Sequence, residues 1–215
     1  VFWLAAVIFL YLVLARDGYH HWDDECYLAE AAYGRESGFR CLWVDHFRLH
    51  VWLVSALVKI VGTGPVAVEL TGAAYALLVA LTALVLAAAA AEAGWVGGSV
   101  ARQVAFVALF LFLPTSLYLG YKTLSEVPAL LFGALSVWLF MRALRAAGLP
   151  AVGFSALSAL AAVLSSTSRL DGILILGAVV VALLLFPGGR RRMDVLLRGC
   201  VALGAIFILY GGLLF

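Results

Sequence analysis

Long apolar runs alternate with short polar segments along most of the chain. A helix that crosses a membrane needs about 20 mostly apolar residues, which several runs reach when flanking residues are added. Glycine-rich turn sequences separate the runs, for example GWVGG at 94–98 and PGG at 187–189. The pattern predicts an all-α fold, a bundle of transmembrane helices. The expected helical runs are 1–15, 51–61, 65–91, 104–119, 127–141, 151–165, 173–186 and 195–215.

The segment 45–61 differs from the other runs. Its longest uncharged stretch, 51–58, is far shorter than a span requires. Such a segment suits an interfacial or re-entrant helix better than a crossing one. The charged and titratable residues that interrupt it are Asp45, His46, Arg48, His50 and Lys59.

The composition supports a membrane setting. Hydrophobic residues make up 66% of the 215 residues and the mean hydropathy is +1.11, whereas a soluble domain is about half apolar. The net charge of +2 says little about partners, because the few charges are localised. We expect membrane lipids around the chain and no nucleic acid partner. Since the chain starts with valine and ends within an apolar run, we expect it to be part of a longer polypeptide.

The arginines give an orientation, because lysine and arginine near span ends favour the cytoplasmic side. Glu126 and Asp171 then lie outside. The acidic loop at 17–36 lies outside with these two residues only if the segment 45–61 does not cross the membrane. The short uncharged stretch favours this topology. This gives one cell-membrane module, 1–215, with about seven spans, its N-terminus inside, and outer loops at 16–64, 118–126 and 166–172. The arginines expected inside are Arg102, Arg142, Arg145 and the run 190–192.

The first outer loop is long and polar, a feature that often accompanies function. Its residues 22–33 have helical spacing, and this helix could lie along the membrane surface. Asp23, Asp24 and Glu25 stand at its start. Acidic residues there can simply cap the helix and oppose its dipole. Three adjacent carboxylates exceed what a cap requires, so the alternative is a catalytic base or a set of metal ligands.

The second outer loop, YKTLSEVPALL, holds Glu126 just before an expected helix. Ser125 or Glu126 can cap that helix, with Pro128 in its first turn. A carboxylate at the mouth of a span is also costly unless it meets a cation or water. Lys122 is a candidate local partner, and both residues are candidates for a site.

The third outer loop, SSTSRLDGIL, holds Arg169 and Asp171. The two residues can form a local ion pair that anchors a tight turn. The alternative is that Arg169 faces an anionic ligand, because a guanidinium binds phosphate with two parallel hydrogen bonds.

Metal and disulfide chemistry have weaker sequence support. The histidines at 20, 21, 46 and 50 form no HExxH helix, and no Cys/His quartet has the spacing of a zinc finger. Cys26 and Cys41 share the first outer loop, where a disulfide could form.

The order of these features resembles a known family. One span precedes an outer loop with DECYLAEA, a short helix ends in IVG, and a second acidic residue precedes a later span. A basic residue and a glycine follow the next span. This order is similar to the N-terminal seven-span module of the GT-C superfamily of membrane glycosyltransferases. It is closest to the branch of protein O-mannosyltransferases and lipid A aminoarabinose transferases.

The resemblance assigns roles to individual residues. It places Asp24 at the catalytic carboxylate of the first loop, with Glu25 as its neighbour, and Glu126 at the second acidic position. Arg169 falls near a basic residue beside the donor phosphate. His46 falls where relatives have a histidine or lysine, although Phe47 and Arg48 replace the usual proline after it. Lys122, His46 and Arg48 are further candidates for binding the phosphate.

The resemblance also implies an activity. Such enzymes take a sugar from a polyprenyl-phosphate lipid and transfer it to a lipid, glycan or protein acceptor on the extracytoplasmic face. Asp24 would be the base for the acceptor hydroxyl, and attack opposite the phosphate would invert the anomeric centre. The resemblance implies no definite cofactor, although a divalent metal is possible. Glu126 could hold such a metal, orient the acceptor or position a cation. The alternatives are a transporter or lipid flippase, and a noncatalytic assembly subunit.

Overall fold

The computed structural model describes residues 2–15, 48–62, 65–96 and 99–169. Several predictions fall outside these residues, including the helix at 22–33, Asp24, Glu25, His46 and the two last expected spans. The backbone of Arg48 is described but its side chain is not. Helices and no strands form the described residues, as the sequence predicts. The helices are α1 (Phe2–Ala15), α3 (Arg48–Val61), α4 (Pro65–Glu92), α5 (Val100–Leu111), α6 (Pro114–Leu119), α7 (Glu126–Arg145) and α8 (Gly148–Ser168).

Three of these helices are long and apolar enough to cross a membrane. Their qualifying segments are Val68–Glu92, Glu126–Arg145 and Gly148–Ser168. The 14 residues of α3 rise only about 21 Å, which is less than the roughly 30 Å of a bilayer's hydrocarbon core. The described part of the chain therefore has membrane-spanning character, while the total of about seven spans stays a prediction.

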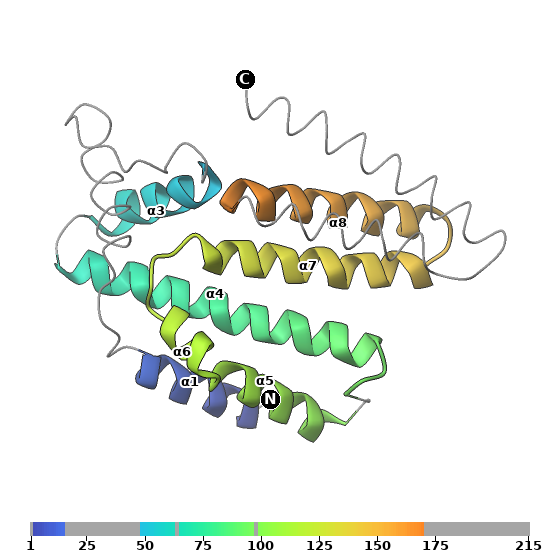
Figure 1. The fold of residues 1–215 in the computed structure, drawn as a ribbon, viewed down its shortest axis with the longest axis horizontal. Helices are drawn as coiled ribbons and strands as arrows, with labels where there is room; N and C mark the ends of the chain where they lie inside the picture. Colours follow the sequence, from blue (N-terminus) through green and yellow to red (C-terminus); the bar gives the residue numbers. More distant parts are fainter. Residues whose placement is uncertain (1, 16–47, 63–64, 97–98, 170–215) are drawn as a thin grey trace.

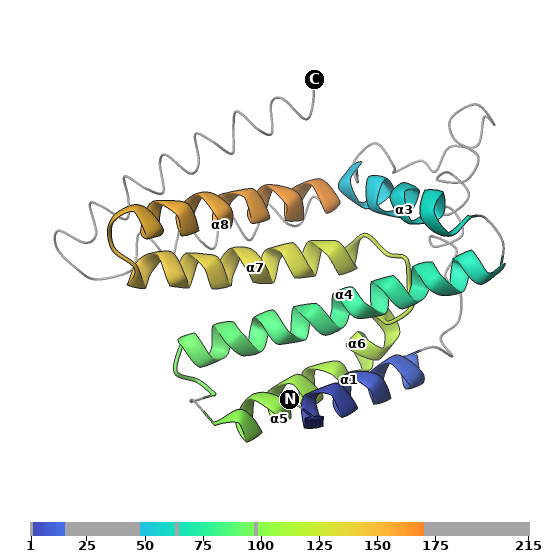
Figure 2. The same ribbon diagram turned by 180° about the vertical axis from the view of Figure 1, so that it is seen from behind.

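The helices pack in the order α8, α7, α4, α5 and α1, with α3 lying along the first part of α4 (Figure 1). The end of α1, the start of α4, the start of α7 and the end of α8 lie together at one end of the bundle, which we call the loop end. The end of α4, the start of α5, the end of α7 and the start of α8 lie at the other end, which we call the arginine end. Figure 2 shows the same arrangement from behind. The chain therefore leaves α1 and enters α4 at the same end.

The expected run 104–119 forms two helices in place of one. Helix α5 ends at Leu111 and α6 begins at Pro114. Proline has no N–H to donate, and it pushes the preceding residue into an extended conformation. Leu113 has φ −62° and ψ 141°, as this effect requires. The proline therefore ends α5 and turns the chain toward the second outer loop.

Helix α3 is amphipathic, and its buried face holds a histidine. His50, Val54 and Val58 recur every four residues and are buried, so they lie on one face of the helix. Trp52 and Ile60 are exposed on its other sides. The buried face packs on α4 and against α8. This packing brings the helix that follows the first outer loop against the loop end of the bundle.

Helices α7 and α8 pack through small residues and serines. The Ser158 hydroxyl donates to the Ser136 carbonyl oxygen at 2.8 Å, and the Ser165 hydroxyl donates to the Ala129 carbonyl oxygen at 2.9 Å. In lipid, close approach and such hydrogen bonds hold helices together, because burial of apolar surface gives little there. The antiparallel pair therefore fixes the end of α8 beside the start of α7.

Candidate functional site

The predicted second outer loop, residues 118–126, packs between α1 and α4 at the loop end. A Cβ on Gly120 would lie 2.5 Å from the Ala15 Cβ and 2.6 Å from the Tyr11 hydroxyl oxygen. A Cβ on Gly72 of α4 would lie 2.9 Å from Cδ1 of Tyr121. The Tyr11 hydroxyl also donates to the Ser116 carbonyl oxygen at 2.9 Å. Only residues without a side chain fit at these two contacts, so the loop position is tightly determined.

Glu126 and Arg169 form an ion pair at the loop end. Glu126 is the first residue of α7, and Arg169 follows the last residue of α8. A carboxylate is favoured at a helix N-terminus and a guanidinium at a C-terminus, so both helix dipoles support the pair. Each side chain is 36% exposed. The pair joins the second and third outer loops while leaving both groups accessible.

The local partner that the sequence suggested for Glu126 is not the one observed. Among the described residues Glu126 pairs with Arg169, and no ion pair joins it to Lys122. The Ser125 side chain makes no cap to the backbone of α7 and donates weakly to Glu126 at 3.4 Å. Capping by Ser125 is therefore wrong as an explanation of this loop. Asp171, the other expected partner of Arg169, lies outside the described residues.

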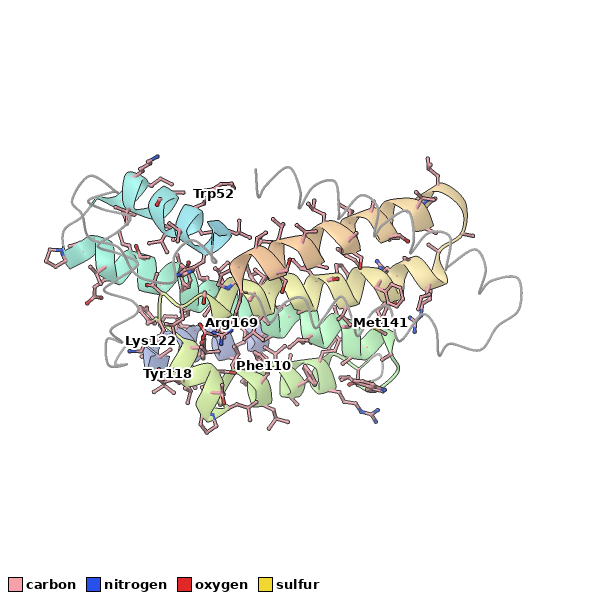
Figure 3. All side chains as sticks on the ribbon, turned by 45° about the horizontal axis from the view of Figure 1, so that its top comes forward. Trp52, Phe110, Tyr118, Lys122, Met141 and Arg169 are labelled. Atoms are coloured by element: carbon pink, nitrogen blue, oxygen red, sulfur yellow. The ribbon has the colours of Figure 1, made fainter. Side chains whose placement is uncertain are left out.

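Lys122 is buried, although it stands in a predicted outer loop. Its residue is 3% exposed, and Thr123 and Ser125 beside it are 2% and 3% exposed. No anionic side chain of residues 2–15, 48–62, 65–96 and 99–169 pairs with its ammonium group. A buried charge is costly unless an opposite charge or several hydrogen bonds compensate it. Figure 3 shows Lys122 and Arg169 toward the loop end, with Met141 near the opposite end. Lys122 and the Glu126–Arg169 ion pair therefore lie at the loop end, close to the predicted outer loops.

His50 of α3 lies next to the second outer loop, and the sequence analysis did not predict this position. Its Nδ1 lies 2.8 Å from the Tyr75 hydroxyl oxygen of α4, and the two rings meet edge to face. The backbone of Thr123 also lies beside the imidazole. One imidazole thus connects α3, α4 and the second outer loop. The regular spacing of His50 with Val54 and Val58 was the available signal that it faces the core.

Burial determines the charge of His50. Desolvation lowers the pKa of this imidazole to about 3, against a smaller opposing effect of the Thr123 backbone. The ring is therefore neutral at physiological pH. It acts as a hydrogen-bonding connector and adds no charge to the loop end.

The described residues alone do not fit a metal site. No group of three or more histidine, cysteine, aspartate or glutamate side chains gathers within them. Arg169 engages Glu126, and Glu69, in the second turn of α4 at the same end, is exposed. Asp24 and Glu25, the other predicted acids, and His46 lie outside the described residues. Lys122 and Arg169 are cationic groups that an anionic ligand at this end could contact.

Comparison with family models, curated proteins and solved structures found no match to the chain.

Proposed function

We propose that the protein is a membrane glycosyltransferase that transfers a sugar from a polyprenyl-phosphate donor to an acceptor hydroxyl. The observation that supports this most is the buried Lys122, for which the described residues supply no anionic partner. A phosphate group on the donor would compensate this charge. Lys122 stands four residues before Glu126, whose ion pair brings Arg169 to the same end of the bundle.

The two cations would stabilise the leaving group. When the bond between the anomeric carbon and the phosphate oxygen breaks, its electron pair stays on the phosphate. Positive groups already in place lower the cost of that charge. Arg169 can bind two phosphate oxygens with its planar fork, and Lys122 adds a compact charge. Glu126 would hold Arg169 in position, which is one of the roles that the sequence left open for it.

The acceptor side would use the first outer loop. The acceptor oxygen attacks the anomeric carbon, and the carboxylate of Asp24 takes its proton. Glu25 would tune its neighbour, and His46 and Arg48 would add positive charge near the phosphate. Attack opposite the phosphate inverts the anomeric centre. The acceptor is a lipid, a glycan or a protein hydroxyl, and no step needs a redox cofactor.

We place the loop end on the extracytoplasmic face of the cell membrane. Ala15, the last residue of α1, lies within contact distance of Gly120 in the second outer loop. The first loop therefore starts at the loop end, where α4 also begins, and this supports placing both loops on the same side. The arginine end would face the cytoplasm. In intact cells a single cysteine at Tyr118 should react with an impermeant thiol reagent, and one at Leu149 should not. The opposite labelling would reverse the orientation.

The charge distribution favours surface chemistry over transport. In α4, α7 and α8 the charged side chains lie near the helix ends, as with Glu69, Glu92, Glu126 and Arg142. Transporters usually place ionisable groups near the bilayer midplane, often at interrupted helices. The transporter or flippase alternative therefore has less support from the described helices than the transferase.

Product analysis in proteoliposomes tests the proposal. The protein would be reconstituted with a polyprenyl-phosphate sugar and a membrane extract as the source of acceptors. A glycosylated product together with polyprenyl phosphate supports a transferase. Donor that reaches the other leaflet unchanged would indicate a flippase. If the protein binds the donor but neither forms a product nor moves the donor across the membrane, it is a noncatalytic subunit.

A further inference from the structure

A second charged cluster lies at the arginine end, far from the proposed catalytic site. Glu92, the last residue of α4, holds two arginines from the end of α7. Its Oε1 lies 3.1 Å from Nη1 of Arg142, and its Oε2 lies 2.6 Å from Nη1 of Arg145. The cluster therefore carries one excess positive charge.

Much of the hydrogen-bonding capacity of the arginines is not used by Glu92. The ion pairs engage one nitrogen of each guanidinium, whereas an arginine has five N–H donors. Within the described ranges, no other side-chain hydrogen bond or ion pair involves these two groups. The side chains of Arg142 and Arg145 are 44% and 57% exposed, while that of Glu92 is 19% exposed. The outward surface of the cluster is therefore cationic.

Two aromatic side chains contact the guanidinium of Arg142 and help to determine its position. Its guanidinium carbon lies 5.6 Å from the ring centre of Trp138 and 5.8 Å from that of Phe154. A guanidinium at these distances is attracted to the ring faces. Trp95, in the turn after α4, is 85% exposed. Tryptophan is enriched at the boundary between lipid and water, so this end has the composition of an interfacial layer.

All three membrane-length helices have a terminus at this end, since α4 ends at Glu92, α7 ends at Arg145 and α8 begins at Gly148. If they cross a bilayer, the cluster lies at the level of the phosphate groups. We propose that Arg142 and Arg145 bind the phosphate of an anionic phospholipid. Two forked guanidiniums match phosphate oxygens, and basic surfaces at the cytoplasmic ends of helices attract anionic lipids. Glu92 orients both arginines and competes with the lipid for them.

Native mass spectrometry of the detergent-solubilised protein tests this proposal. Phosphatidylglycerol and phosphatidylcholine would be offered in equal amounts. The protein should retain phosphatidylglycerol about tenfold more than phosphatidylcholine, and Arg142→Gln with Arg145→Gln should abolish the preference. Arg102→Gln, an exposed arginine at the same end, is the matched control and should keep it. Equal retention of the two lipids by the unmodified protein would overturn the proposal.

Glu92→Gln distinguishes lipid binding from a purely structural cluster. Removing the competing carboxylate should increase retention of phosphatidylglycerol, whereas a structural ion pair would predict lower stability and no gain of lipid. A parallel arm offers glycerol phosphate, which has the same phosphate chemistry without acyl chains. It should not displace the lipid at equal concentration. Displacement would assign the arginines to a soluble anion, and lack of gain in Glu92→Gln would contradict the competition.

Discussion

Glu126 at the start of α7 is ion-paired with Arg169 at the end of α8, 43 residues later in the chain. The pair depends on the antiparallel packing of the two helices, which serine-to-backbone hydrogen bonds support. Because it is partly exposed, it adds little to stability, at most about 1 kcal/mol. Its position between two loops that the sequence had placed on one side agrees with the proposed role of Glu126 in holding Arg169 toward a ligand.

Substitution of Arg169 should affect donor use more than folding. Arg169→Ala removes a charge-assisted contact with phosphate, so the KM for the donor should rise about 10- to 100-fold. Arg169→Lys should recover only part of this loss, because a point charge lacks the two-pronged geometry. Arg102→Ala, an exposed arginine at the arginine end, is the control and should leave the KM unchanged. Donor kinetics that do not change in Arg169→Ala would remove Arg169 from the site.

The sequence predicted the helices well but not the partner of Glu126. Apolar runs identified α4, α7 and α8, because membrane-length helices need long uninterrupted apolar sequences. Asp171, the neighbour suggested for Arg169, lies outside the described residues. Glu126 was assigned Lys122, whereas it pairs with Arg169. Their actual pairing depends on how α7 and α8 pack, which local sequence does not encode. The break before Pro114 could have been predicted from the proline, but the apolar character of the run concealed it.

Lys122 should contribute to donor binding without contributing to stability. Lys122→Met keeps much of the side-chain volume and removes a buried charge. Replacing a buried charge with an apolar group is often neutral or stabilising, so the melting temperature should stay the same or rise. Donor affinity should fall at least tenfold, by roughly 1.4 kcal/mol. Lys59→Met, an exposed lysine of α3, should alter neither quantity. Unchanged donor affinity in Lys122→Met would contradict the phosphate assignment.

The Gly120 contact should be sensitive to a single methyl group. In Gly120→Ala the new Cβ would overlap Ala15 and the Tyr11 hydroxyl, and overpacking of this kind costs about 1–3 kcal/mol. The backbone at Gly120, with φ −63° and ψ 138°, allows alanine, so the cost is steric. Gly153→Ala in α8 is the matched control, because its Cβ meets nothing within 4 Å. Thermal unfolding in detergent should show a loss for Gly120→Ala alone; equal melting temperatures would refute the close contact.

The buried imidazole of His50 should make stability depend on pH. Its pKa is about 3 in the folded protein and about 6.5 when exposed, so the unfolded chain binds more protons between these values. The stabilisation is complete above the exposed pKa and is lost as the pH falls below it, by up to about 1.4 kcal/mol per pH unit. Unfolding free energies measured between about pH 7.5 and pH 5 should fall more steeply for the unmodified protein than for His50→Gln. Identical slopes would contradict the burial of a neutral imidazole.

Two features of the loop end show where sequence reasoning stops. Lys122 stands in a short polar loop, and its burial arises from tertiary packing that the local sequence does not encode. His50 was considered as a metal ligand, whereas its four-residue spacing with Val54 and Val58 marks a core position. The proposed base and its neighbours lie outside the described residues, so the roles of Asp24 and Glu25 still rest on the resemblance.

Release of polyprenyl phosphate by Asp24→Asn in proteoliposomes tests the proposed transferase most directly. The substitution keeps the shape of the side chain and removes its basicity, so the release rate should fall about 10²- to 10⁴-fold while donor binding changes little. Asp23→Asn should cost only about 1 kcal/mol of local helix stability if Asp23 is a cap. A release rate in Asp24→Asn equal to that of the unmodified protein would contradict the account, as would a failure of the unmodified protein to release polyprenyl phosphate at all.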